Sequence, residues 1–186
     1  TILIENVMPT ISAVAIIGSG TMGNGIAHVC AQYGFPVALC DVKQEFLDRA
    51  LATIGSNLDR QIKKATVTED QKRAILGLIT PVTDLAKAVG NAGLVIEAVT
   101  EKAEVKKALF RDLDRLAGPD AILATNTSSI SITELAATTR RPDKVIGMHF
   151  MNPVPVMKLV ELIRGLSTSN ETYATIQALT EKLEKT

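Results

Sequence analysis

The chain has 186 residues, 46% of them hydrophobic and 22% charged, so it is long and apolar enough to bury the core of one domain and is not expected to be disordered. Its 20 basic and 20 acidic residues balance, and neither sign forms a long block, which speaks against a nucleic-acid partner and against a membrane surface. No stretch reaches the ~20 apolar residues of a membrane span, and residues 1–12 lack the pattern of a signal peptide.

The two cysteines lie in apolar patterns, Cys30 in a predicted helix and Cys40 near the end of a predicted strand. We expect buried free thiols rather than a disulfide, which fits a cytoplasmic location. The two histidines lie far apart in the sequence and no Cys–His cluster occurs, so no metal site is expected.

Short apolar runs alternate with longer amphipathic stretches along the chain. The runs predict strands at Ala13–Gly18, Pro36–Asp41, Leu94–Val99, Ala121–Thr125 and Val145–Phe150. The stretches predict helices at Thr21–Tyr33, Lys43–Lys64, Thr68–Ile79, Lys102–Leu116 and Ile132–Thr138. Because the strands lack polar alternation and are separated by helices, we expect a doubly wound α/β fold with a mostly parallel sheet.

The pattern changes after the last of these strands. A second extended run, Met157–Ile163, follows directly after Met151–Val156, which contains two prolines. That connection is too short for a helical crossover, so antiparallel strands are expected near the C-terminus. A last helix is predicted over Asn170–Lys185 with no stop signal, and we expect the complete protein to continue beyond it.

Side-chain caps mark the starts of two predicted helices. Thr68 with Gln71, and Ser131 with Glu134, have the spacing of capping boxes. Asp41 has the same spacing to the glutamine at position 44, so one interpretation of Asp41 is a helix cap.

A glycine-rich turn joins the first predicted strand to the first helix, with the sequence Gly18-Ser19-Gly20-Thr21-Met22-Gly23. In a dinucleotide site the first glycine allows a tight turn, the second lets the pyrophosphate approach the backbone, and the third lets helix and strand pack closely. Asp41 closes the second strand, where a carboxylate can accept the ribose hydroxyls of NAD. We therefore predict NAD as cofactor, although the turn could be purely structural and Lys43 keeps NADP open.

His149 is predicted at the C-terminal end of a parallel strand, where open α/β sheets bind ligands. A neutral imidazole can take a hydroxyl proton when an alcohol is oxidised. If the chain turns near Pro155, Glu161 falls opposite His149 and can orient it. We expect Glu161 to be buried among apolar neighbours, at positions Leu159, Val160, Leu162 and Ile163. From spacing alone, a core histidine and an exposed edge-strand glutamate remain alternatives.

The chain resembles 3-hydroxyacyl-CoA dehydrogenases from about Ala13 to its end. The resemblance rests on four segments in the same order, Ala15–Gly23, Asn126–Ser129, His149–Pro153 and Lys158–Ile163. It implies a Rossmann-type NAD-binding domain over 13–186 after an N-terminal extension over 1–12. It also implies NAD-dependent oxidation of a (3S)-3-hydroxyacyl-CoA to the 3-ketoacyl-CoA, in fatty-acid β-oxidation or butanoate metabolism. The family's helical C-terminal domain, which forms a homodimer, is absent from these residues.

The resemblance also implies four catalytic residues. His149 is the general base and Glu161 its orienting partner, while Ser128 and Asn152 position the substrate oxygen and contact the cofactor. The alternatives are a helix-start cap for Ser128 and a turn residue for Asn152.

Further binding residues follow from the same resemblance. Besides the glycine turn and Asp41, NAD contacts are implied at Ala98, Glu101 and Lys106, with a solvated helix start as the alternative. An acyl-CoA partner is implied to meet Asn57 and Lys64 in addition to Ser128, although a lysine at a helix end is usually solvated. Two other functions remain open: a related 3-hydroxy-acid dehydrogenase whose substrate lacks CoA, and a non-catalytic NAD-binding or structural protein.

Overall fold

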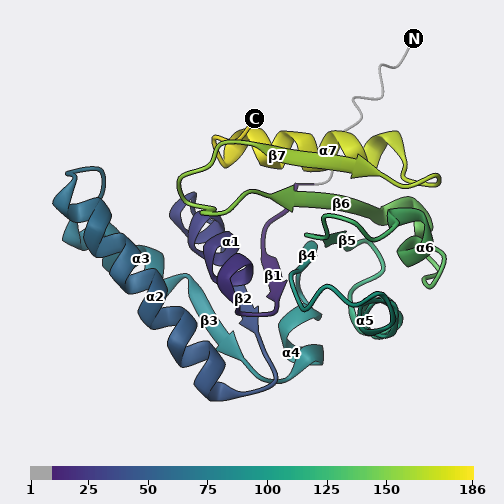
Figure 1. Cartoon of the computed structure of the whole chain (residues 1–186), viewed down its shortest axis with the longest axis horizontal. Helices are drawn as coiled ribbons and strands as arrows, with labels where there is room; N and C mark the ends of the chain where they lie inside the picture. The colour runs from purple at the N-terminus through teal and green to yellow at the C-terminus, as the bar shows by residue number, and fades with distance from the viewer. Residues whose placement is uncertain (1–9) are drawn as a thin grey trace, which may run out of the picture.

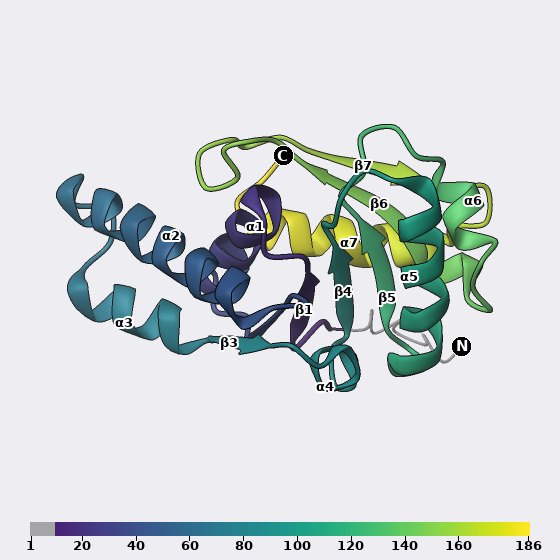
Figure 2. The ribbon, with the colours of Figure 1, turned by 60° about the horizontal axis from the view of Figure 1, so that its bottom comes forward.

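A computed structural model describes residues 10–186, which form one seven-stranded sheet covered by helices on both faces (Figures 1 and 2). Of the expected N-terminal extension, residues 1–9 lie outside the described part, and 10–12 have no helix or strand. Within 10–186, no helix is long and apolar enough to cross a bilayer.

The sheet has the order β3-β2-β1-β4-β5-β6-β7. Its strands are β1 (Val14–Ile17), β2 (Val37–Cys40), β3 (Ile79–Val82), β4 (Leu94–Glu97), β5 (Ile122–Thr125), β6 (Val145–Phe150) and β7 (Val160–Arg164). The first six are parallel, and β7 runs antiparallel to β6. The chain winds outward from β1 in both directions, so the predicted doubly wound, mostly parallel fold is confirmed.

The helices divide between the two faces of the sheet. One face is covered by α1 (Thr21–Gln32), α2 (Gln44–Lys63), α3 (Glu69–Gly77) and α7 (Asn170–Lys182). The other is covered by α4 (Leu85–Val89), α5 (Ala103–Leu116) and α6 (Ile132–Ala136), and the single 3₁₀ turn of the described chain, η1 (Pro142–Lys144), leads into β6. Alternate residues of the central strands enter the two cores, for example Ile16 on one face and Ala15 on the other. This double burial explains why the strands lack polar alternation.

Two elements escaped the sequence prediction. The helix predicted to reach Ile79 ends at Gly77, and Ile79–Val82 forms the edge strand β3 instead. This strand is short and contains Pro81, which sheets tolerate at their edges because proline donates no ladder hydrogen bond. The short helix α4 begins where the Asp84 side chain accepts a hydrogen bond from the Lys87 N–H, at 3.1 Å.

The last strand also begins later than predicted. The extended run was expected from Met157, but residues 151–159 form turns and an irregular connection, and β7 begins at Val160. The antiparallel pairing itself is confirmed. Both parts of the predicted capping box at Thr68 are present, and the Ser131 hydroxyl accepts a hydrogen bond from the Glu134 N–H.

The two cysteines are free and buried, as predicted. Burial raises the pKa of the Cys30 thiol to about 12, and burial together with the nearby charges of Asp41 and Asp84 raises that of Cys40 to about 11. Both thiols are therefore unreactive in the folded domain.

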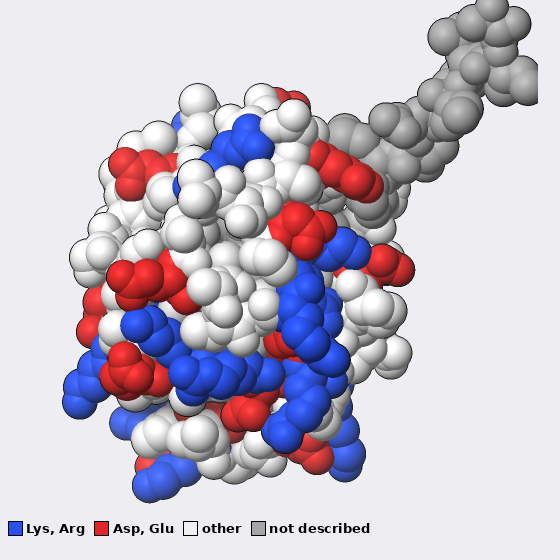
Figure 3. All heavy atoms as spheres, turned by 90° about the vertical axis from the view of Figure 1, so that its right-hand side faces the viewer, with Lys and Arg blue, Asp and Glu red and all other residues white. Residues whose placement is uncertain are grey.

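Charged side chains of both signs lie interspersed on the side of the molecule that carries α5 and α6 (Figure 3). Ion pairs join many of them, including Lys107 to Glu134, Arg115 to Asp112, Arg140 to Asp114 and Lys144 to Asp120. The basic side chains seen there are thus largely matched by neighbouring carboxylates.

Candidate active site

The turn between β1 and α1 requires glycine at two of its positions. Gly18 has a φ of +98°, and a Cβ there would lie 2.7 Å from the Ala98 carbonyl oxygen. A Cβ on Gly23 would lie 1.7 Å from the Gly18 carbonyl oxygen. These two glycines therefore let the turn, β4 and α1 pack closely, which is a structural role.

Gly20 has no such internal reason to be glycine. A Cβ built on it meets no atom within 4 Å. It caps α1 without a side-chain hydrogen bond, so N–H groups of the first turn are left for a ligand. Beside it opens a hollow of about 290 Å³, lined in part by Ser19, Gly20, Thr21 and Asp41. A side chain at position 20 would extend into this space. Because Gly20 has none, the hollow and the N–H groups beside it fit the pyrophosphate of a dinucleotide.

Asp41 is tied to this turn and is not a helix cap. One carboxylate oxygen accepts hydrogen bonds from the backbone N–H and the hydroxyl of Ser19, each at 2.7 Å, and the other accepts from the Val42 N–H at 2.7 Å. The cap residue of α2 is Lys43, and the Gln44 side chain donates to Asp48 instead. Asp41 therefore holds the end of β2 against the glycine turn and faces the same hollow.

The predicted pairing of His149 with Glu161 is present. The register of β6 and β7 places the two residues opposite each other, and His149 Nδ1 lies 2.8 Å from Glu161 Oε2. The expectation that Glu161 is buried is wrong, because its side chain is 52% exposed while that of His149 is 21% exposed. Since β7 is an edge strand, Glu161 is exposed and still reaches the imidazole.

His149 opens onto a cleft at the C-terminal ends of the parallel strands. The cleft has a volume of about 370 Å³ and is lined by Met22, Ala98, Val99, Glu101, Asn126, Ser128, His149, Phe150, Met151 and Asn152. The fold therefore brings together six of the predicted site residues from four separate segments, at positions 22, 98, 101, 128, 149 and 152. With Nδ1 engaged by Glu161, the second imidazole nitrogen is left for a ligand.

A buried ion-pair network supports the floor of this cleft. Lys106 is 1% exposed, and its ammonium lies 2.6 Å from Glu97 Oε1 and 3.3 Å from Glu101 Oε2. The other carboxylate oxygen of Glu97 accepts a hydrogen bond from the Thr125 hydroxyl at 2.6 Å. The alternative of a solvated helix start is thus wrong for Lys106, which links β4, β5 and the start of α5.

Glu101 connects that network to the segment that carries Ser128. Its carboxylate accepts hydrogen bonds from the Thr127 hydroxyl and, at 3.2 Å each, from the Ser128 N–H and the Ser129 hydroxyl. Burial opposes ionisation of Glu101, but these hydrogen bonds and the Lys106 charge outweigh it, so the pKa of Glu101 lies below its ordinary value. Ser128 itself is exposed in the cleft, and α6 is capped by Ser131, so Ser128 is not a helix cap.

The sequence interpretation assigned no role to three residues of this site. Glu97 anchors Lys106, Thr127 holds Glu101, and the Asn126 side chain accepts a hydrogen bond from the Phe150 N–H at 2.8 Å. A signal was present for Glu97, because a carboxylate that ends a wholly apolar strand pattern needs a buried partner. Asn126 ends β5 beside the end of β6, a proximity that only the strand order reveals.

The two predicted CoA contacts lie outside the cleft. Asn57 is half-buried on α2 and accepts a hydrogen bond from the Arg60 guanidinium at 3.1 Å, and Lys64 is the exposed C-cap of that helix. They lie seven residues apart on α2, which is about two turns. The fold therefore places them near each other but does not bring them to His149.

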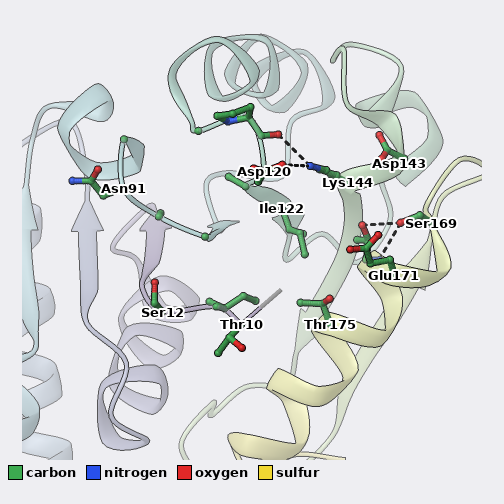
Figure 4. A pocket seen from close by; sticks show the side chains of 18 residues that line it. Thr10, Ser12, Asn91, Asp120, Ile122, Asp143, Lys144, Ser169, Glu171 and Thr175 are labelled. Carbon is green, nitrogen blue, oxygen red and sulfur yellow. Dashed lines mark hydrogen bonds and ion pairs between the residues drawn. The ribbon is translucent and has the colours of Figure 1, made fainter. Parts of the chain in front are cut away.

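A larger cavity lies elsewhere, at the N-terminal ends of the parallel strands. Its volume is about 740 Å³, and it is lined by the segments before β1, β4 and β5 and by the start of α7 (Figure 4). It contains none of the predicted site residues. No group of three or more metal-ligating side chains occurs among residues 10–186.

Comparison with known proteins identifies the family. The sequence model described as "3-hydroxyacyl-CoA dehydrogenase, NAD binding domain" matches residues 13–186. The chain belongs to this family. Its cofactor is therefore NAD, in agreement with the open glycine turn and Asp41, and the resemblance inferred from the sequence is confirmed.

Relatives and solved structures agree with this assignment. A 3-hydroxybutyryl-CoA dehydrogenase of Bradyrhizobium diazoefficiens is 49% identical over 94% of this chain and 59% of its own. A probable 3-hydroxybutyryl-CoA dehydrogenase of Bacillus subtilis is 46% identical over 95% of this chain and 61% of its own. The crystal structure of (S)-3-hydroxybutyryl-CoA dehydrogenase PaaH1 from Ralstonia eutropha matches with a TM-score of 0.92 and 48% identity, over 95% of this chain and 62% of that one. The chain thus spans about three fifths of the length of these relatives.

Proposed function

We propose that the complete protein oxidises a (3S)-3-hydroxyacyl-CoA to the 3-ketoacyl-CoA with NAD, and that His149 is the general base. The observation that carries this proposal is the His149–Glu161 contact of 2.8 Å at the mouth of a cleft that also holds Ser128 and Asn152. The family membership and the names of the relatives support it.

The proposed reaction assigns a task to each side chain. When bound, the nicotinamide accepts the hydride that leaves the substrate carbon. His149 takes the hydroxyl proton on the ring nitrogen that Glu161 leaves free. Glu161 holds the imidazole in orientation and stabilises the positive charge that it gains. Ser128 and Asn152, both exposed in the cleft, hold the substrate oxygen beside His149.

Cofactor contacts are proposed on both sides of the glycine turn. The turn of residues 18–23 would hold the pyrophosphate and Asp41 the adenosine ribose, since Ser19, Gly20, Thr21 and Asp41 line the same hollow. Ala98 and Glu101 line the cleft on the nicotinamide side. Because Lys106 is buried beneath Glu101, we propose that it acts on the cofactor side by fixing that carboxylate.

The remaining partners are also proposals. Asn57 and Lys64 on α2 can receive polar groups of CoA, because an amide and an exposed ammonium lie two turns apart on one helix. A homodimer formed by a further helical domain is proposed for the complete protein, whose relatives are longer than this chain.

The decisive experiment is turnover of acetoacetyl-CoA with NADH by the complete protein, with free acetoacetate as the matched substrate. We expect turnover only with the CoA ester. Equal rates with both substrates would replace the CoA assignment by a 3-hydroxy-acid dehydrogenase. Tight NADH binding without turnover of either would leave an NAD-binding protein that is not an enzyme of this class.

The cofactor assignment has its own test. NADH should bind more tightly than NADPH in calorimetry, and Asp41→Ala should narrow that gap, because it removes the carboxylate that accepts ribose hydroxyls and repels the extra phosphate. Asp48→Ala, at an exposed carboxylate one turn into α2, is the matched control and should leave the gap unchanged.

A further inference from the structure

A buried lysine holds the segment that carries Asn152. This segment, residues 151–157, connects β6 to β7 and passes over α1 beside the end of the chain (Figure 1). The Lys185 ammonium donates hydrogen bonds to the carbonyl oxygens of Val154 at 2.6 Å and Met157 at 2.7 Å. Lys185 is only 9% exposed. It therefore joins two points of the segment by short, charge-assisted contacts.

No carboxylate accompanies this ammonium among residues 10–186, where its partners are the two neutral carbonyl groups. Burial, together with the nearby charge of Lys158, lowers the pKa of Lys185. Placing a cation here is therefore costly in stability. A methionine of similar length could fill the same space without that cost, so the charge is not needed for packing, and what it adds is the two hydrogen bonds.

The segment is fixed from two further directions. Val154 is 2% exposed and packs on α1 where that helix has a glycine, since a Cβ on Gly25 would lie 2.9 Å from the Val154 Cβ. The backbone of Thr186 exchanges hydrogen bonds with Lys158 and Val160, each at 2.8 Å. The segment is thus held between α1 and the residues that follow α7.

We propose that Lys185 is a positioning residue for the reaction, whose ammonium fixes residues 151–157 and so sets where Asn152 and Met151 stand in the cleft beside His149. The proposal rests on the proposed function, because Asn152 is taken to hold the substrate. Asn152 and Met151 line the cleft. Val154 and Met157, whose carbonyl oxygens accept hydrogen bonds from Lys185, follow Asn152 by two and five residues. A small displacement of such a group costs up to about a hundredfold in rate.

The test compares Lys185→Met with controls in the complete protein. We expect kcat for acetoacetyl-CoA reduction to fall by about ten- to a hundredfold, with the NADH dissociation constant unchanged because the glycine turn is untouched. Lys182→Met removes an exposed lysine of the same helix end and should change neither quantity. Leu183→Ala opens a hole beside Lys185 at a residue 1% exposed, and should lower Tm without lowering kcat per folded molecule.

Gly25→Ala provides a second, independent displacement of the same segment. It retains Lys185 but drives a methyl group into Val154, so it should lower kcat in the same way. If Lys185→Met does not fold, the kcat of Gly25→Ala tests the proposal instead. An unchanged kcat in Gly25→Ala would overturn the proposal. A Lys185→Met enzyme that loses only Tm, as Leu183→Ala does, would overturn it as well.

Amide hydrogen exchange separates this proposal from the proposed function. The N–H groups of Val156 and Met157 both donate to the Pro153 carbonyl oxygen, at 3.0 and 2.9 Å. Their exchange should accelerate in Lys185→Met and stay unchanged in Lys182→Met, whether or not the enzyme turns over acetoacetyl-CoA. An inactive parent protein with faster exchange would refute only the function, and unchanged exchange would refute the role of Lys185.

Discussion

Two acid–base pairs lie at the same end of the sheet and differ in their access to water. Lys106 and Glu97 are 2.6 Å apart with side chains 1% and 0% exposed, whereas His149 and Glu161 are 2.8 Å apart with side chains 21% and 52% exposed. The first pair joins a central strand to a helix. The second bridges the last two strands at the edge of the sheet.

The difference in exposure matches a difference in task. A buried ion pair resists any change, because removing either member strands the other charge in an apolar interior. It is therefore suited to fix the strand ends and Glu101 beneath the cleft. A pair reached by water can take up and release a proton at each turnover. In the proposed mechanism, the buried pair is therefore a structural support and the exposed pair carries out the proton transfer.

The largest expected effect is on the exposed pair. In the complete protein, His149→Ala should reduce kcat for acetoacetyl-CoA reduction by about 10²–10⁴-fold, the usual contribution of a positioned acid–base group. NADH affinity, measured by fluorescence, should change little because the dinucleotide is held at the glycine turn. Lost NADH binding with normal turnover per bound molecule would make His149 a structural residue.

Breaking the buried pair should cause a large loss of stability. Lys106→Met leaves Glu97 without its cation, and the free energy of unfolding in urea should fall by about 3–5 kcal/mol. Adding Glu97→Gln should recover part of this loss, since no uncompensated charge then remains. Lys107→Met, at the neighbouring lysine with surface carboxylate partners, should have a far smaller effect. Comparable losses in both lysine variants would contradict the comparison.

Glu161→Gln should have an intermediate effect on rate and little on stability. It keeps a hydrogen-bonding oxygen but removes the charge that orients His149, and because water reaches the pair the loss should be about ten- to a hundredfold in kcat. The fold, followed by circular dichroism, should be intact. Glu171→Gln, at an exposed carboxylate of α7, is the control. An unchanged kcat for Glu161→Gln would show that Glu161 is an edge-strand residue without a role in the reaction.

The smallest expected effect concerns the other histidine, His28, which is buried and for which residues 10–186 provide no carboxylate partner. Burial lowers the pKa of His28, hydrogen bonding to the Gln61 and Gln32 side chains raises it, and the nearby charge of Lys185 lowers it further. The unfolded chain, with an ordinary histidine pKa of about 6.5, therefore binds the proton more readily. Stability from neutral His28 is present above that pH and is lost as the pH falls toward the lower folded value. Urea unfolding at pH 7.5 and 5.5 should show this loss, and His28→Gln should reduce it.

Local patterns predicted much of the active site. The connection after β6 is too short for a helical crossover, which predicted antiparallel strands, and a turn near Pro155 predicted Glu161 opposite His149, with a core histidine and an edge-strand glutamate as alternatives. The register confirms the pairing. Capping at Thr68 was visible for the same reason, since both partners lie within one turn. Exposure was harder to predict. Apolar neighbours suggested burial of Glu161, but a strand at the edge of a sheet carries the same composition as one inside it.

The sequence by itself predicted the doubly wound fold, the glycine turn and the antiparallel strands that carry His149 and Glu161, because each depends on residues close in the chain or on strand and helix periods. Only the tertiary structure decided which charges are buried. Lys106 forms an ion pair with Glu97, and Lys185 donates hydrogen bonds to Val154 and Met157, because distant elements pack together. Whether a charged side chain is buried depends on which elements pack against it. The order of the strands and the packing of the helices determine those neighbours, and the local composition of the sequence does not.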